Sequence, residues 1–358
     1  MPDPTIQPDE SILDFCRGLK LSAEEFTKLV EDFAGLRVLV IGDTIFDRYS
    51  YSEVQGLTSK NRILSSRFVN EETQCGGALA VARHVAQFCP DTRFLSLVGC
   101  EDWVDPMLND SLKGIRDVTL REASFTTIIK QRFVEPVSEG KEMTKLFSVN
   151  FIDADPPKND VQQRVYDHLA NAMKEVDVVL LADFGHGMMQ EKIRDLVQDS
   201  APYLALNCQT NSNNHGFNII NRQYRRADAF SLDKQELLLA CGHRHVSYSD
   251  ELENLRGHLS AGFGWLTRGP VETIGNHGGS ELSFCPPLER EVVDTVGAGD
   301  AFFSVASLAA AKGLPVHIGT FLGQLAGAQA VRIVGNVEPI SKDVLLRSAS
   351  HLLNLANE

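Results

Sequence analysis

The clearest pattern along this chain is a series of mainly apolar runs, each followed by polar or glycine residues. The runs lie at 38–41, 94–99, 178–182, 204–206 and 229–232. Such runs are typical of parallel strands that are buried on both faces. Segments with apolar residues at helical spacing lie between them. The pattern therefore predicts an α/β fold in which helices cover both faces of a mostly parallel sheet.

Two segments have a different pattern. Residues 48–74 and 124–152 alternate polar and apolar positions without a long helix, and the second segment is interrupted by a polar turn at 138–141. This alternation predicts hairpin strands that form a small second sheet. Near the N-terminus, Ser22 and Glu25 form a capping-box pattern that predicts a helix before the first core strand. We expect a helical extension at 1–35 and the main domain at 36–358.

Composition narrows the functional classes. The 358 residues suit one large α/β domain or two modest domains, and the net charge of −14 argues against nucleic-acid partners and anionic membrane surfaces. Seven cysteines without a metal-ligand spacing predict reduced thiols, and no apolar run reaches membrane-spanning length. We expect a cytoplasmic protein.

The stretch from Val293 to Phe303 contains the strongest candidate chemistry. Gly297, Ala298 and Gly299 place small residues at the start of a predicted helix. The free backbone N–H groups there, together with the helix dipole, would attract an anion such as a transferring phosphoryl group. Asp300 lies in the first turn, where its carboxylate could take a proton from an attacking hydroxyl.

The string Asp-Thr-x-Gly-Ala-Gly-Asp-x-Phe at 294–302 resembles the C-terminal signature of ribokinase-like (PfkB) carbohydrate kinases. The resemblance implies a ribokinase-like fold with a β-sheet lid, and a kinase that uses ATP and Mg²⁺. It implies Asp300 as the catalytic base and Gly297, Ala298 and Gly299 as the anion hole. A monovalent cation is a further ligand to test, and in this family the lid often pairs two subunits, so we expect a homodimer.

A second string, Gly-Asp-x-x-x-Asp-Arg-Tyr at 42–49, resembles the start of bacterial heptose-phosphate kinases. It implies that Asp47 binds the sugar with Asp43 as support, although Asp43 could equally cap a turn. Gly76 and Gly77 begin the next helix, where backbone without side chains lets a sugar approach closely. A heptose phosphate is therefore the favoured acceptor.

Three further residues are expected to bind the acceptor. Lys130 and Arg132, in the second lid segment, are candidates for holding a phosphate group, with solvated surface charges as the alternative. Asp183 follows a core strand and could bind the sugar or the metal, or form an Asx turn.

The resemblance also implies a nucleotide site. In the family, the glutamate that matches Glu236 organises Mg²⁺ through water. The expected ATP-binding residues are Asn207, Glu236, Thr267, Gly269, Gly327, Ala328 and Val331. Packing would explain the last three equally well.

Four positions depart from the family pattern: Ala80, His186, Asp233 and Glu272. An amide-rich loop at 209–218 resembles a subgroup that occurs alone or joined to a nucleotidyltransferase, so a separate nucleotidyltransferase of the same pathway is an expected partner. No physical role for this loop follows from its sequence.

Three rival functions stay open. A nucleoside kinase of the same fold would need a base-stacking pocket, for which Tyr49 and Tyr51 are candidates. A non-catalytic sugar- or nucleotide-binding protein would account for the four departures, but it would have little use for Asp300. A dimerisation module would not bind ATP.

Overall fold

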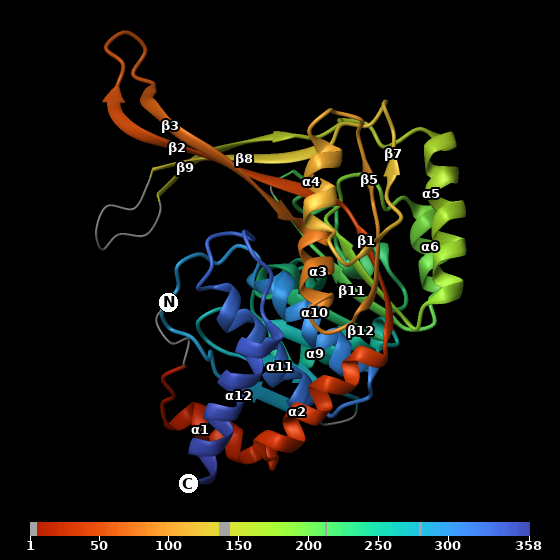
Figure 1. The fold of residues 1–358 in the computed structure, drawn as a ribbon, viewed down its shortest axis with the longest axis vertical. Helices are drawn as coiled ribbons and strands as arrows, with labels where there is room; N and C mark the ends of the chain where they lie inside the picture. Colours follow the sequence, from red (N-terminus) through yellow and green to blue (C-terminus); the bar gives the residue numbers. More distant parts are fainter. Residues whose placement is uncertain (1–5, 136–143, 212, 279–280) are drawn as a thin grey trace.

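The computed structural model describes residues 6–135, 144–211, 213–278 and 281–358, so the polar turn expected at 138–141 lies outside it. Helices α1 (Glu10–Leu19) and α2 (Ala23–Glu31) come first, followed by a 3₁₀ turn (Asp32–Gly35). The Ser22–Glu25 capping box forms as the sequence predicts. Both helices pack against the C-terminal helix α12 (Lys342–Asn357), so the N-terminal and C-terminal helices lie side by side (Figure 1).

A nine-stranded sheet forms the core, and its strands are parallel except for β14 and β15 at one edge. In spatial order they are β15 (Leu282–Cys285), β14 (Thr273–Asn276), β13 (Phe263–Thr267), β12 (Ala229–Asp233), β11 (Leu204–Cys208), β10 (Val178–Asp183), β1 (Arg37–Gly42), β4 (Asp91–Leu95) and β6 (Arg116–Asp117). The short strands β5 (Leu97–Val98) and β7 (Leu120–Arg121) pair separately.

Helices cover both faces of this sheet. On one side, α10 (Ala298–Ala311) packs between α3 (Gly77–Val85) and α11 (Val316–Ala330), while α5 (Asn159–Ala172) and α6 (Glu191–Ser200) lie on the other side (Figure 1). Helix α10 is buried from Asp300 to Ala310. A Cβ at Gly323 would lie 2.5 Å from the ring of Phe302, so glycine permits the close approach of α10 and α11. The remaining helices are α4 (Val104–Ser111), a 3₁₀ turn (Met173–Glu175), α7 (Ile220–Gln223), α8 (Lys234–Cys241) and α9 (Tyr248–His258).

The second sheet, which we call the lid sheet, has the strand order β3-β2-β8-β9. Its strands are β2 (Thr44–Leu57), β3 (Leu64–Gly76), β8 (Ile128–Glu135) and β9 (Thr144–Phe151). Only Asp43 separates core strand β1 from lid strand β2, so the lid sheet begins at the carboxyl edge of the core sheet. The β2–β3 ribbon projects well beyond the body of the molecule (Figure 1).

These two sheets confirm the predicted fold class, a mostly parallel α/β core with a small lid sheet. Within the described residues, no helix combines the length and the hydropathy needed to cross a bilayer.

Candidate active site

Two cavities meet at the carboxyl edge of the core sheet, and residues of the lid sheet line the smaller of them. The smaller has a volume of about 300 Å³ and the larger about 900 Å³. Both are lined by Asp233, Thr267, Thr295 and Gly299. Open α/β sheets bind ligands at this edge because the polar residues that follow each strand gather there. A molecule in one cavity can therefore reach a molecule in the other.

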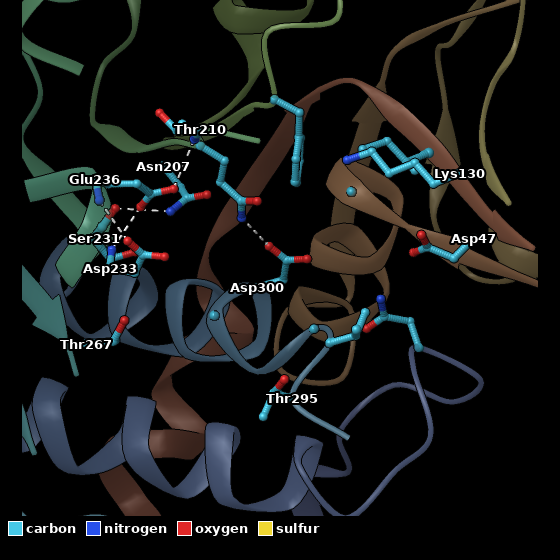
Figure 2. A pocket seen from close by; sticks show the side chains of 18 of the residues that line it. Asp47, Lys130, Asn207, Thr210, Ser231, Asp233, Glu236, Thr267, Thr295 and Asp300 are labelled. Atoms are coloured by element: carbon cyan, nitrogen blue, oxygen red, sulfur yellow. Dashed lines mark hydrogen bonds between the residues drawn. The ribbon is translucent and has the colours of Figure 1, made fainter. Parts of the chain in front are cut away.

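The smaller cavity brings together most of the expected acceptor and catalytic residues (Figure 2). Its lining includes Asp47, Gly77, Lys130, Arg132, Asn207, Glu236, Thr267, Gly297, Gly299 and Asp300. These residues come from both sheets and from the starts of three helices, α3, α8 and α10.

The larger cavity is lined by five of the seven residues expected to bind the nucleotide, whereas Asn207 and Glu236 line the smaller one. The lining of the larger cavity includes Thr267, Gly269, Ala298, Gly299, Gly327, Ala328 and Val331. Apolar side chains such as Val271, Leu288 and Val292 complete the wall. A mostly apolar cavity with a polar mouth suits a nucleotide whose base lies inside and whose phosphates point outward.

The start of helix α10 has the geometry of an anion site. Gly297 is the N-cap, with φ of 84°, and a Cβ there would lie 2.1 Å from Oδ1 of Asn336. Both features require glycine at this position. The Ala298 N–H makes only a long bond of 3.4 Å to the Thr295 carbonyl, and the first-turn N–H groups have no acceptor within the helix. The turn therefore offers several donors to one anion.

The Asp300 carboxyl lines the smaller cavity (Figure 2), and the preceding residue, Gly299, lines both cavities. The Asp300 carboxyl is buried and accepts a hydrogen bond of 2.9 Å from the Gln209 side chain. Burial, with a smaller effect of the Asp47 charge, raises the pKa of Asp300 to about 7; the Gln209 hydrogen bond and the Lys130 charge oppose this rise. A carboxyl with a pKa near neutrality is suited to general base catalysis, because it can both accept and hold a proton at cellular pH.

Asp47 and two basic residues form the lid side of the smaller cavity. The Asp47 carboxylate is paired with the Arg132 guanidinium, which also lies over the Tyr49 ring. The Lys130 ammonium lies 5.7 Å from the centre of the Phe184 ring, and burial lowers the pKa of Lys130. Two partly desolvated cations in one cavity are suited to binding a phosphate group.

Asp233 and Glu236 form a second capping box at the start of α8. Both carboxylate oxygens of Glu236 accept backbone N–H groups, from Thr210 at 3.1 Å and from Asp233 at 2.8 Å. Burial, followed by the charge of Asp233, raises the pKa of Glu236 to about 8. The departure from asparagine at 233 therefore preserves the helix cap while adding a negative charge beside Glu236.

Three expected acceptor residues line neither cavity. The Asp183 carboxylate accepts the Gly185 N–H at 2.8 Å, an Asx-turn bond, and the Tyr224 hydroxyl at 2.6 Å. Asp43 accepts the His186 N–H at 3.1 Å. Gly76 leaves room for the Asp47 carboxylate, because a Cβ at this position would lie 2.2 Å from Oδ2 of Asp47. The Asp183 bond to Gly185 is the Asx turn of the alternative interpretation. Asp43 instead makes a long-range bond, and its Oδ1 is buried without a hydrogen-bond partner among the described residues.

The structure also shows the surroundings of the other three residues that depart from the family pattern, His186, Glu272 and Ala80. His186 is buried, and its pKa is lowered to about 3 by burial and by the Lys130 charge, so it is neutral. Glu272 pairs with Arg268, and Ala80 is buried in α3. Tyr49 is also buried, and the hydroxyl of Tyr51 donates to Glu72; neither ring lines either of the two cavities.

Several cavity residues were not predicted from the sequence. They are Gln209, Thr210, Ser231, Thr295 and Asn336. Gln209 and Thr210 belong to the amide-rich loop, and Thr295 lies within the 294–302 signature. Both motifs were recognised in the sequence, but these individual side chains were not predicted to line a cavity. Asn336 lies in a turn without any motif, and only its approach to Gly297 reveals it.

Comparison with known proteins agrees with this geometry. Residues 220–343 match the family model described as pfkB family carbohydrate kinase. The bifunctional protein HldE of Koribacter versatilis is 26% identical over 327 residues, and that of Rhodopseudomonas palustris is 26% identical over 321 residues. Each alignment covers 87% of this chain and 62% of the relative, so the chain spans less than two thirds of these relatives.

Solved structures share the fold. Phosphofructokinase-2 from Escherichia coli in complex with fructose-6-phosphate superposes with a TM-score of 0.66 at 13% identity, covering 88% of this chain and 99% of that one. A carbohydrate kinase from Agrobacterium tumefaciens gives 0.62 at 19% identity, covering 87% and 96%. The phosphofructokinase has also been solved with potassium. Residues 220–343 therefore resemble the pfkB family of carbohydrate kinases, and the chain shares the fold of the solved phosphofructokinase-2 and carbohydrate kinase.

Proposed function

We propose that this protein transfers the γ-phosphoryl group of ATP to a hydroxyl of a sugar phosphate, with a heptose phosphate as the favoured acceptor. One observation carries the proposal: a nucleotide-sized cavity and a smaller polar cavity share Gly299 at the start of α10, next to Asp300. The resemblance of residues 42–49 to heptose-phosphate kinases favours the heptose.

In this proposal the nucleotide occupies the larger cavity and the acceptor occupies the smaller one. Asp300 takes the proton of the acceptor hydroxyl, and the oxygen forms its bond to the γ-phosphorus as the bond from that phosphorus to the β,γ-bridging oxygen breaks and ADP leaves. The first-turn N–H groups at Gly297–Gly299 face the negative charge that develops on the transferring group. Asp47 and Gly77 position the sugar, and Lys130 and Arg132 hold its phosphate group.

The residues between the cavities fit a hydrated magnesium ion. The side-chain oxygen of Asn207 is buried without a hydrogen-bond partner among the described residues, and Asp233 and Glu236 line the same space. Within the described ranges no group of three or more acidic, histidine or cysteine side chains is placed to hold a metal. Mg²⁺ commonly keeps its waters and binds the substrate phosphates, so Glu236 would hold it through water. When bound, the ion neutralises phosphate charge.

The lid sheet supports a homodimer. It exposes an apolar surface, the lid patch, made of Leu57, Ile63, Leu64, Phe68, Val69, Phe147, Val149 and Phe151. Exposed apolar patches of this kind mark interaction surfaces, and a second copy of the same sheet would cover this one. A nucleotidyltransferase that consumes the phosphorylated sugar is the partner reaction we expect in the same pathway.

The test is acceptor-dependent release of ADP from Mg-ATP. We would measure heptose, hexose and pentose phosphates, each beside its unphosphorylated sugar, together with nucleosides, with and without K⁺. A heptose phosphate well above the background and above its free sugar is the expected result. ATP binding with no turnover on any acceptor would favour the binding-protein alternative. A nucleoside as the best acceptor would overturn the acceptor assignment.

A further inference from the structure

The amide-rich loop at 209–218 reaches the proposed base. Its first residue, Gln209, directly follows strand β11 and donates its side-chain N–H to Oδ1 of Asp300 at 2.9 Å. Figure 2 draws this contact as the dashed line that ends at Asp300. The bond joins two positions that are 91 residues apart in the chain.

The backbone of Gln209 is fixed on both sides. Its N–H donates to the carbonyl of Asp183 at 2.8 Å, and its carbonyl accepts the side-chain amide of Asn218 at 3.1 Å. The next N–H, of Thr210, donates to Glu236. Because these partners belong to strand β10, the loop and helix α8, the side chain of Gln209 starts from a well-defined position.

The other amides of the loop hold it against the core. Asn211 and Asn214 both donate to the carbonyl of Phe184, at 2.8 and 2.7 Å. Asn214 also accepts the N–H of Asn211 at 2.8 Å. Amide side chains can donate and accept without carrying charge, which suits a loop that must be rigid beside several carboxyl groups.

The charges around Asp300 show why the donor should be neutral. Asp47 adds negative charge from β2, and Lys130 adds positive charge from β8, with Arg132 beside it on the same strand. A second cation at the base would hold Asp300 permanently ionised and weaken it as a proton acceptor. An amide favours the ionised form without adding net charge.

We propose that Gln209 is a positioning residue for Asp300, and that the amide-rich loop serves to hold it. Its N–H fixes one oxygen of the carboxylate, which orients the other toward the acceptor hydroxyl, and it favours the ionised form of the base. This inference rests on the proposed function, but the state of the Asp300 carboxyl can be measured without turnover.

The experiment replaces Gln209 with methionine, which has a similar length and no donor. The carboxyl ¹³C signal of Asp300, identified by its loss in Asp300→Asn, is followed against pH in the protein without ligands. We expect the titration midpoint to rise by roughly 0.5 to 1 pH unit, because a hydrogen bond to the ionised form is lost. The acidic limb of the kcat/KM profile should move the same way, and kcat at neutral pH should fall about tenfold, with ATP affinity within about twofold of wild type.

Gln223→Met is the matched control. Its side chain donates to the carbonyl of Phe217 at 3.1 Å, near the same loop but away from Asp300, so neither midpoint nor profile should move. Gln209→Glu keeps the size of the side chain and replaces the N–H donor with a carboxylate, so it should raise the titration midpoint of Asp300 further. This second variant keeps the inference testable if the methionine variant does not fold. An unchanged Asp300 midpoint in a folded Gln209 variant overturns the inference. If wild type transfers no phosphoryl group, the same titration still decides the role of Gln209, separately from the proposed function.

Discussion

The side-chain nitrogen of Lys145 lies 3.3 Å from the buried carboxylate of Asp294. Lys145 belongs to lid strand β9, and Asp294 begins the stretch that leads into α10. The other oxygen of Asp294 accepts the N–H of Gly335 at 3.1 Å. One carboxylate therefore joins the lid sheet, the catalytic turn and the segment beyond α11.

Lys145→Met should weaken acceptor binding more than it slows chemistry. Without the ion pair the lid sheet loses a contact to the catalytic turn, and we expect the KM for the acceptor to rise about three- to tenfold, with kcat changed less. The pair is half exposed on the lysine side, so a larger effect is not expected. Steady-state kinetics measures this. The control is Arg67→Met, which breaks an exposed lid pair with Glu53; equal effects of the two variants would contradict the idea.

Asp300→Asn should abolish most turnover while preserving ATP binding. Loss of a general base costs about 10²–10⁴-fold in rate. Wild-type kcat/KM should also fall as pH drops below about 7, because Asp300, whose pKa is raised to about 7, then becomes protonated. Coupled ADP assays and calorimetry measure the two quantities. Turnover within about tenfold of wild type would rule out Asp300 as the base.

Glu236→Gln should stabilise the free protein at alkaline pH. The folded pKa of Glu236 is about 8 against 4.5 for an unperturbed glutamate, so the folded state binds more protons between these values and its stability falls as pH rises through them. Removing the ionisation should add about 1 to 3 kcal/mol to the free energy of unfolding at pH 9, and less near pH 5. Urea denaturation at both pH values measures it. The same variant should need more Mg²⁺ for half-maximal activity.

His186→Gln should reduce the loss of stability in acid. Burial lowers the pKa of His186 to about 3 in the folded protein, whereas the unfolded value is near 6.5. The stability that the protein gains from keeping this imidazole neutral is fully present above pH 6.5 and is lost as pH falls toward 3. Between pH 7.5 and 5.5 wild type should lose about 1 kcal/mol more than the variant, measured by urea denaturation. Parallel curves for the two proteins would show that His186 is not held neutral. The pKa of His84 is also lowered to about 3, so His84 should cause a similar loss of stability in acid in both wild type and variant.

Phe147→Asp should convert the proposed dimer into monomers. Phe147 lies in the lid patch, stacked on Phe133 and 54% exposed. A carboxylate there would have to be desolvated at the interface. Sedimentation velocity measures the mass. Phe217→Asp is the control, because Phe217 is 79% exposed but lies in the loop after β11 and is not part of the lid patch. A monomeric wild type would refute the dimer.

Local patterns predicted the fold and the start of α10 because both depend on short stretches. Apolar runs indicate buried strands, and the glycines around Ala298 leave room only for a tight turn. The partner of Asp300 could not be predicted in this way, because Gln209 lies 91 residues away and nothing in its own stretch indicates which group it contacts. Asp183 remained ambiguous for a related reason: both alternatives need the same residue, and only the hydrogen bond to Gly185 separates them.

The long strand β2 is attached to the core at one end and irregularly paired toward the other. At its root, a single residue joins it to the core sheet, and the Asp43 side chain there is hydrogen-bonded to the 186 backbone. Farther out, the pairing of β2 with β3 shifts register between Tyr51 and Ser52 and again between Val54 and Gly56. Such bulges bend a strand and increase its local twist. The attachment of the root to the core therefore fixes the position of Asp47, whereas the two bulges set the direction in which the outer ribbon leaves the body of the molecule.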